Sequence, residues 1–172
     1  MWMPPPLFAT PDLLDAVVAE VPPEFASIRA ANGGFALVEH VHHLADFEVE
    51  GFGLRIERVA TEDLPLLLDF DGDATAVARR YLELPVAPSV ARFRAARTAN
   101  LARLADLDPA RGGVQQGVGP VTLADLARRM VDHDRAHFAR LADLLRSLTP
   151  GSVAPLARID AFVQVNGEPT SS

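Results

Sequence analysis

The sequence contains no cysteine among its 172 residues. A disulfide framework and a thiolate metal site are therefore excluded, and a metal ion must be held by histidine, aspartate or glutamate. No apolar run approaches the roughly 18 consecutive residues that a membrane-spanning helix needs, and residues 1–6 lack the basic and apolar regions of a secretory signal. We therefore expect a cytoplasmic protein that does not associate with a membrane, which the lack of cysteine also fits.

A basic cluster is also missing. The chain has 16 lysine and arginine residues against 23 aspartate and glutamate residues, for a formal net charge of -7. Binding nucleic acid requires positive groups gathered on one face, so we expect no nucleic-acid partner. With 49% apolar and 23% charged residues, the composition is that of one ordinary globular domain with a substantial core.

Hydrophobic residues recur at helical spacing through most of the chain. This periodicity predicts four principal helices, over residues 11–31 (broken at Pro22-Pro23), 35–59, 89–107 and 122–148. Shorter helices are expected over residues 74–82 and 153–163, with a glycine-rich loop over 108–121 and no strand. Four helices with long connections predict an all-α four-helix bundle. We assign residues 1–165 to a single domain and residues 166–172 to a frayed tail.

Capping residues support several of these boundaries. Ser89 is a plausible N-cap for the third principal helix. Thr122 and Asp125 form a capping-box pattern at the start of the fourth. Two segments are typical of turns that end a helix. They are Asn32-Gly33-Gly34 and Thr149-Pro150-Gly151.

The pattern that carries chemistry is the pair His133 and His137. Residues four apart on a helix share one face, so two imidazoles at this spacing can approach one ion. A helical wheel places both on the apolar arc, beside Leu126, Met130 and Leu141. A buried imidazole without a partner costs about 1–3 kcal/mol, so each ring needs either a metal ion or a hydrogen bond to a neighbouring helix.

The helix over residues 35–59 contains the other three histidines, His40, His42 and His43. Adjacent positions on a helix point about 100° apart, so these three cannot all bind the same ion. All five histidines of the chain therefore lie in two helices. This concentration favours one shared site over scattered surface histidines.

Residues 35–46, FALVEHVHHLAD, resemble the W-S-x-x-E-x-x-x-H-L-x-D pattern of the DinB/YfiT-like superfamily. Residues 55–71, 93–101 and 119–137 are similar to further segments of that family, and the resemblance covers residues 12–148. Two departures are visible. Phe35-Ala36 replaces the family's Trp-Ser, and Arg129 or Met130 stands where a histidine often occurs.

This resemblance implies an up-down-down-up four-helix bundle with short extra helices, often found as a homodimer. It implies that His43, His133 and His137 hold one divalent metal ion, which is zinc, nickel or iron in relatives. Three imidazoles leave a coordination position open for water or substrate, as catalytic sites do. Characterised relatives include thiol S-transferases and thiol-dependent isomerases, and many members have no known activity.

We therefore expect a metal-dependent enzyme acting on a small molecule, either a small-thiol S-transferase or a related hydrolase or isomerase. Any thiol must be an external low-molecular-weight compound, because the chain has no cysteine. The alternative is a non-catalytic, stress-linked dimer whose metal site is structural or vestigial. A site open to a cleft would favour the enzyme, and a sealed site the alternative.

Several polar residues near these histidines have two interpretations. Asp134 is either a carboxylate that orients a metal ligand or a partner for an arginine on another helix. Asp46 is either a carboxylate that orients a metal ligand or part of a solvated acidic stripe with Glu39, Glu50 and Glu57. His40 and His42 are expected to be packing or surface residues. Asp69, Asp71 and Asp73 are interpreted as a turn and capping cluster.

Overall fold

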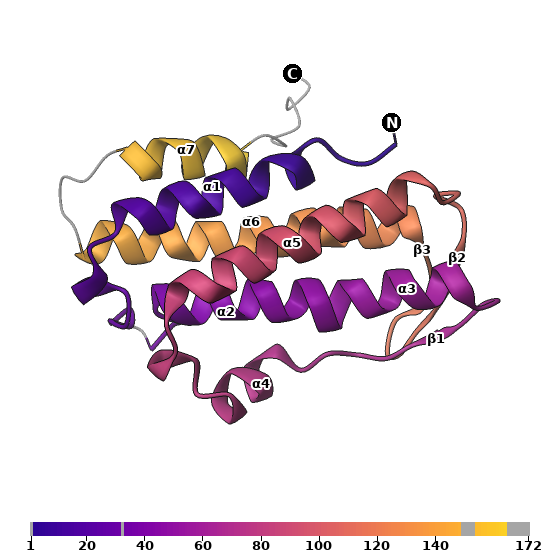
Figure 1. The fold of residues 1–172 in the computed structure, drawn as a ribbon, viewed down its shortest axis with the longest axis horizontal. Helices are drawn as coiled ribbons and strands as arrows, with labels where there is room; N and C mark the ends of the chain where they lie inside the picture. Colours follow the sequence, from indigo (N-terminus) through magenta and orange to yellow (C-terminus); the bar gives the residue numbers. More distant parts are fainter. Residues whose placement is uncertain (1, 32, 149–153, 165–172) are drawn as a thin grey trace, which may run out of the picture.

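The computed structural model describes residues 2–31, 33–148 and 154–164, and four long helical rods dominate it (Figure 1). One rod is continuous through three segments: helix α2, a π-helical segment η2 and helix α3. The rods are α1 (Pro6–Glu20), α2–η2–α3 (Leu37–Asp46, Phe47–Gly53 and Leu54–Thr61), α5 (Val86–Ala105) and α6 (Leu123–Leu148). The α2–α3 rod and α5 run in one direction, and α1 and α6 run in the other (Figure 1). The predicted four-helix bundle with up-down-down-up topology is confirmed.

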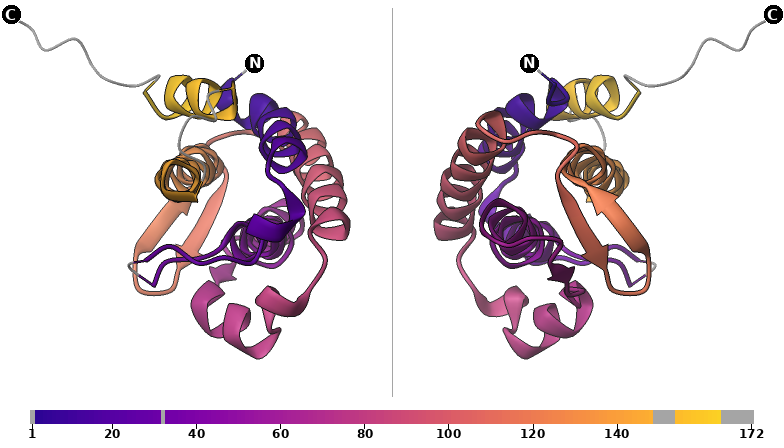
Figure 2. Two further views of the ribbon diagram at one scale, coloured as in Figure 1. Left: turned by 90° about the vertical axis from the view of Figure 1, so that its left-hand side faces the viewer. Right: turned by 90° about the vertical axis from the view of Figure 1, so that its right-hand side faces the viewer.

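Shorter elements complete the structure. The crossover from α3 to α5 contains β1 (Leu66–Leu67), α4 (Gly72–Ala78) and the 3-10 turn η3 (Tyr81–Glu83), and η1 (Pro23–Phe25) follows α1. Helix α7 (Ala154–Gln164) packs beside α1 and α6 at the edge of the bundle (Figure 2). Within the described ranges, no helix has both the length and the apolar character needed to cross a bilayer. The predicted frayed tail at 166–172 and the turn at 149–151 lie outside the described residues.

Helix α1 begins at Pro6, five residues earlier than predicted, and continues through Pro11. A proline in the first turn is tolerated because that position has no intrahelical amide bond to lose. Pro11 cannot donate to the carbonyl of Leu7, four residues earlier. The buried Arg97 guanidinium donates to that carbonyl instead, at 3.3 Å, so a residue from α5 satisfies the acceptor.

The expectation of no strand is wrong. Strands β2 (Gly112–Gln115) and β3 (Gly119–Thr122) form an antiparallel hairpin, and β1 pairs with β2 in parallel. The strands are too short, and too rich in glycine and proline, to show the alternation from which a strand is recognised. Gly113 is required by close packing, because a Cβ atom there would lie 2.4 Å from the Pro65 carbonyl oxygen.

Two predicted helix features also differ from the structure. The helix expected over 35–59 contains the π-helical turns of η2, which periodicity alone did not reveal. Helix α5 begins at Val86, after Pro85, so Ser89 is a buried helical residue and not an N-cap. At the start of α6, the Thr122 hydroxyl accepts from Asp125 N (3.1 Å) and Asp125 accepts from Thr122 N (2.9 Å). The predicted capping box is therefore confirmed.

The apolar core is divided into two clusters along the bundle. One contains Leu14, Leu44 and Phe138, and the other contains Leu7, Ile56 and Met130. On each rod, a buried polar residue stands between the segments that supply the two clusters. These four residues, from α1, η2, α5 and α6 in turn, are Thr10, Glu48, Arg97 and Asp134, and we call them the arginine cluster.

Candidate metal centre

Three histidines from two rods meet in the middle of the bundle. His43 lies in α2, and His133 and His137 lie one turn apart in α6. Each offers a ring nitrogen, and these nitrogens all lie within 4.8 Å of one another. The structure thus brings together the three predicted ligands, although 90 residues separate His43 from His133.

The spacing of His43 and His133 is that of two ligands of one ion. Their Nε2 atoms are 3.2 Å apart, and their rings are nearly parallel, with an interplanar angle of 20°. Two nitrogens bound to a tetrahedral ion at about 2.0–2.1 Å would be separated by about 3.4 Å. The same distance also fits a hydrogen bond between two neutral imidazoles.

Burial keeps these imidazoles uncharged. Burial, followed by the charges of His43 and Arg97, lowers the pKa of His133 to about 3. Burial also lowers the pKa of His43 and that of His137. Near neutral pH each ring therefore has an unprotonated nitrogen, which is the form of histidine that binds metal ions.

The second nitrogen of His43 faces the backbone of α4. Its Nδ1 atom is buried and has no partner of good hydrogen-bonding geometry among the described residues, although the backbone of Gly72 is close enough to offset part of the lowering of the His43 pKa that burial causes. The start of α4 closes over this ring, and a Cβ atom at Gly72 would lie 2.4 Å from His43 Cε1 and 2.9 Å from Phe47 Cε2. Only glycine allows the backbone to approach the imidazole so closely. Gly72 therefore helps to set the position of the His43 ring.

His40 is a fourth histidine in contact with this group. It is 2% exposed, and its Nδ1 atom lies 2.9 Å from His137 Nδ1. The prediction for His40 was a packing or surface residue; the structure buries His40 and gives it a hydrogen bond to a candidate ligand. Positions 40 and 43 are three apart and so share a helix face, and this signal pointed toward His40. His40, His43, His133 and His137 are called the histidine cluster below.

His42 lies on another face of α2. Its Nδ1 atom is 2.6 Å from Ser89 Oγ, and its ring stacks on Tyr81 at a centroid distance of 5.2 Å. These contacts join α2 to α5 and to η3. His42 is therefore a packing residue, as expected.

Asp46 is 1% exposed, so the solvated acidic stripe is a wrong interpretation for this residue, as it is for Glu39 at 2%. The Asp46 carboxylate accepts hydrogen bonds from Tyr81, Arg79 and Arg92. Burial raises its pKa, but these three donors lower the pKa overall. None of its hydrogen bonds in the described part of the chain is to a histidine, so its observed role is to join α2 to η3 and α5.

Asp134 binds an arginine on another helix, which is one of its two predicted roles. Arg97 donates to it through Nη1 (2.8 Å) and Nη2 (3.1 Å), and Nη2 also donates to Glu48 (2.8 Å). The Thr10 hydroxyl lies 2.9 Å from Asp134 Oδ2. Burial alone would lower the Arg97 pKa, but Asp134 and Glu48 raise it overall. The arginine cluster thus holds one cation between two carboxylates.

The acidic residues before α4 behave as turn and capping groups. Asp71 accepts a hydrogen bond from Ala74 N at 2.9 Å and so caps α4. Asp69 forms an ion pair with Arg55 at 3.1 Å. The capping interpretation is confirmed for Asp71, and this cap holds α4 against the His43 ring.

A cavity of about 640 Å³ opens in front of the three histidines. All three ligand candidates line it, together with His40 and Arg140. Its walls come from α2, α6, the segment before α2 and the start of α4, and the apolar part of these walls consists of Phe35, Phe47 and Phe70. The candidate ligands therefore face a space large enough for a small molecule.

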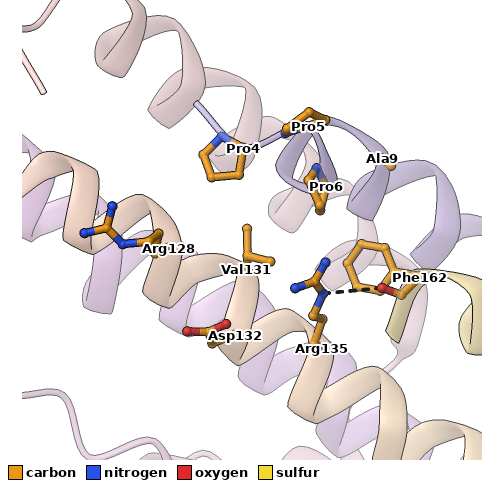
Figure 3. A pocket seen from close by; sticks show the side chains of 9 residues that line it. All are labelled: Pro4, Pro5, Pro6, Ala9, Arg128, Val131, Asp132, Arg135 and Phe162. Carbon is orange, nitrogen blue, oxygen red and sulfur yellow. Dashed lines mark hydrogen bonds between the residues drawn. The ribbon is translucent and has the colours of Figure 1, made fainter. Parts of the chain in front are cut away.

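Another cavity, of about 490 Å³, lies between the start of α1, α6 and α7 (Figure 3). Pro4, Pro6 and Ala9 form one wall, and Val131 and Phe162 face them. Arg135 donates to the Phe162 carbonyl oxygen at 3.3 Å (Figure 3). No member of the histidine cluster lines this cavity, so we place the chemistry at the histidine-lined cavity.

Comparisons with known proteins agree with this architecture. The family model described as the DinB superfamily matches residues 7–141. The chain belongs to the DinB superfamily. The resemblance seen in the sequence motifs is thereby confirmed over the four-helix core, and this DinB protein has its three candidate ligands within the matched range.

Two relatives were found by sequence and by structure. A protein of Geobacillus thermodenitrificans (strain NG80-2), named "putative metal-dependent hydrolase", is 35% identical over 80 residues, which are 46% of this chain and 44% of that protein. The match thus spans less than half of that relative. A solved structure, titled "YfiT from Bacillus subtilis is a probable metal-dependent hydrolase with an unusual four-helix bundle topology", superposes with a TM-score of 0.75 over 83% of each chain at 22% identity. At this identity the likeness shows the fold.

Proposed function

We propose that this DinB protein is a metal-dependent enzyme in which His43, His133 and His137 hold one divalent ion. The observation that carries the proposal is the convergence of three uncharged imidazoles on an open cavity, two of them buried and one, His133, partly buried, with ring nitrogens within 4.8 Å of one another. Placing several imidazoles together in an apolar core costs free energy unless their ring nitrogens bind a hydrogen-bond partner or a metal ion. The names of the two relatives, both of which mention metal dependence, support the same assignment.

The residues present fit a divalent ion. His43 and His133 direct Nε2 atoms at each other, and the hydrogen bond from His40 occupies Nδ1 of His137, which leaves its Nε2 atom for the ion. Imidazole nitrogen suits zinc, nickel and iron alike. An ion bound by three histidines would supply Lewis acidity, lowering the pKa of a coordinated thiol or water so that it is a nucleophile near neutral pH.

The protein's own residues would position the ligands and shape the cavity. The bond between His40 and His137 fixes the tautomer and orientation of a ligand ring. Gly72 permits α4 to close over His43. Phe35, Phe47 and Phe70 form the apolar part of the cavity wall beside the ligands.

Transfer of an external low-molecular-weight thiol to an electrophile is our first choice of reaction. The chain has no cysteine to act as nucleophile, and the cavity of about 640 Å³ has room for a small thiol. Hydrolysis is the second candidate, supported by the names of the two relatives. The alternative of a non-catalytic dimer is less favoured because the site opens to a cavity. A homodimer remains part of the proposal, and no nucleic acid or membrane is assigned as a partner.

The first experiment measures metal in protein purified without a histidine tag. We expect about one divalent ion per chain, since three imidazoles define a single site. His137→Ala should remove the ion and keep the helical circular-dichroism spectrum. The matched control is His42→Ala, a histidine outside the cluster, which should retain the ion. Stoichiometric metal in His137→Ala would refute the assignment.

A second experiment separates the reactions. The metal-loaded protein is incubated with an electrophile and a panel of small thiols, and separately with a panel of esters and amides. Thiol-dependent loss of electrophile that His137→Ala abolishes supports the transferase. Hydrolysis without added thiol supports the hydrolase. A metal-replete protein inactive in both panels would favour the non-catalytic alternative.

A further inference from the structure

The strongest unexplained feature near the candidate centre is Arg140. It lies in α6, one turn after His137, and its side chain is exposed. Among the residues that the structure describes, no carboxylate lies within salt-bridge distance of its guanidinium. The neighbouring acid, Asp143, is paired with Arg146 at 3.2 Å. Most other arginines in the described ranges donate to a carboxylate or a carbonyl oxygen, and Arg140 differs from them in having no counter-charge there.

Arg140 lies where two cavities adjoin. The first is the cavity of about 640 Å³ that contains the three candidate ligands. The second, of about 560 Å³, extends along α6 away from the ligands, toward Leu144 and Ser147. The residues that line both cavities are Gly33, Gly34, Phe35, His40 and Arg140. Together the two cavities form one elongated site with a positive group at its middle.

Arg140 is close to the centre itself: it lies one helical turn after His137 in α6 and lines the same cavity as His43, His133 and His137. An arginine near the ligands raises the electrostatic cost of a cation there, which is a disadvantage for a site that only stores a metal ion. A positive group in this place is useful when an anionic molecule occupies the site together with the ion.

Resting on the proposed function, we propose that Arg140 binds the carboxylate of a substrate whose reacting atom lies at the three-histidine centre and whose remainder occupies the second cavity. A guanidinium presents paired N–H groups that match the two oxygens of a carboxylate. A singly charged group fits better than a dianionic phosphate, because the first cavity is also lined by acids (Asp69, Asp71 and Asp73) and the second by Asp143. The substrate class is therefore a small carboxylate-bearing molecule that is longer than the first cavity alone would hold.

The test uses the full chain loaded with Zn²⁺ and pairs of thiols that differ only in charge. The probes are ω-mercaptocarboxylates, from mercaptoacetate to 6-mercaptohexanoate, and the matching primary amides. Affinities are measured by calorimetric titration. At the best chain length we expect the acid to bind about tenfold more tightly than its amide, the usual scale for a hydrogen bond to a charged group.

Three variants test whether Arg140 causes the preference for the acid over the amide. Arg140→Gln should abolish the preference for the acid and leave the affinity for the amide unchanged. Arg140→Lys should keep part of the preference, because the charge remains. Arg103→Gln removes an exposed arginine of α5 that lines neither cavity, and it should behave as the wild type. No preference at any chain length, or a preference that survives in Arg140→Gln, overturns the proposal.

Failure of the metal assignment would be recognised separately. The zinc content of each preparation is measured first, and a wild-type chain without zinc contradicts the proposed function. In that case the metal-free protein is titrated with the same acids and amides while the Arg140 Nε–H resonance is followed by NMR. A shift caused by the acids alone supports the carboxylate site, and equal shifts or none overturn it.

Discussion

The middle of the bundle contains two buried polar clusters that differ in how their groups are satisfied. In the arginine cluster, Arg97 donates to Asp134 and Glu48, and each of these three side chains is 1% exposed. In the histidine cluster, neutral rings contact one another, and His43 Nδ1 has no partner among the described residues. The first cluster pairs a cation with carboxylates inside the protein, although Arg97 Nε has no partner among the described residues, whereas the second directs uncharged Nε2 atoms at a common point that an ion can share.

This difference separates structure from function. A buried ion pair contributes little net stability, but removal of one partner is costly because the other charge stays buried. A metal site contributes stability only while the ion is bound. Substitutions in the arginine cluster should therefore lower the free energy of unfolding under all conditions. Substitutions of the candidate ligands should cost additional stability when metal is present, because they also remove the ion.

The largest effect is expected for Arg97→Met. This change leaves Glu48 and Asp134 without their cation, and it should lower the free energy of unfolding by about 3–5 kcal/mol. Urea denaturation of the metal-free protein measures it. Arg94→Met, one turn earlier in α5, breaks the more exposed pairs with Asp12 and Asp15 and should cost less than about 1 kcal/mol. Equal losses in the two variants would contradict the role of the arginine cluster.

Metal removal should have the next largest effect. At a free-ion concentration a hundred times the dissociation constant, binding stabilises the folded state by about 2.7 kcal/mol. A chelator should therefore lower the free energy of unfolding of the wild type by about this amount. The same chelator should leave His137→Ala unchanged. If both proteins lost the same stability, the ion would have to bind outside the histidine cluster.

His40→Leu tests whether the contact with His137 orients a ligand. Loss of such a contact typically weakens metal affinity about 10- to 100-fold, which competition with a chromophoric chelator measures. His40→Asn keeps an acceptor close to the position of Nδ1 and should recover part of the loss. A role limited to packing would show no such recovery, and both variants would then bind metal alike.

The smallest effect is expected for Gly72→Ala. The added methyl group would meet the His43 ring and displace it, so we expect metal affinity to fall about tenfold, or about 1.4 kcal/mol. Thr75→Ala is the matched control, because it removes the hydroxyl bond to the Asp71 carbonyl oxygen (2.7 Å) within α4 and does not touch the imidazole. If metal affinity fell equally in both variants, the loss would be due to a less stable α4 and not to contact with the His43 ring.

Much of the fold was predictable because it depends on local pattern. The helical period located the principal helices, and the Thr122–Asp125 box located the start of α6. The β2–β3 hairpin was missed because its short strands are stabilised by pairing with each other and with β1. Ser89 was misassigned as a cap because its hydroxyl bonds to His42, a residue far away in the sequence.

The candidate site shows the same division. The spacing of His133 and His137, and the family motif around His43, identified the three candidate ligands before any coordinates. The partners of Asp46 and Asp134 are arginines from other helices, and periodicity along one helix carries no information about which side chain lies opposite. The roles of Gly72 and Arg140 likewise depend on how distant segments approach the site.

The sequence by itself determined the helical bundle and the chemistry that the site can use: imidazole ligands and no thiol of its own. Only the tertiary structure decided which polar groups meet: Arg97 with two carboxylates, His40 with His137, and Arg140 with no carboxylate in the part of the chain that the structure describes. The physical reason is the distance along the chain over which each interaction acts. Helical periodicity and capping act within a few residues, whereas burial and charge pairing depend on the packing of all four rods.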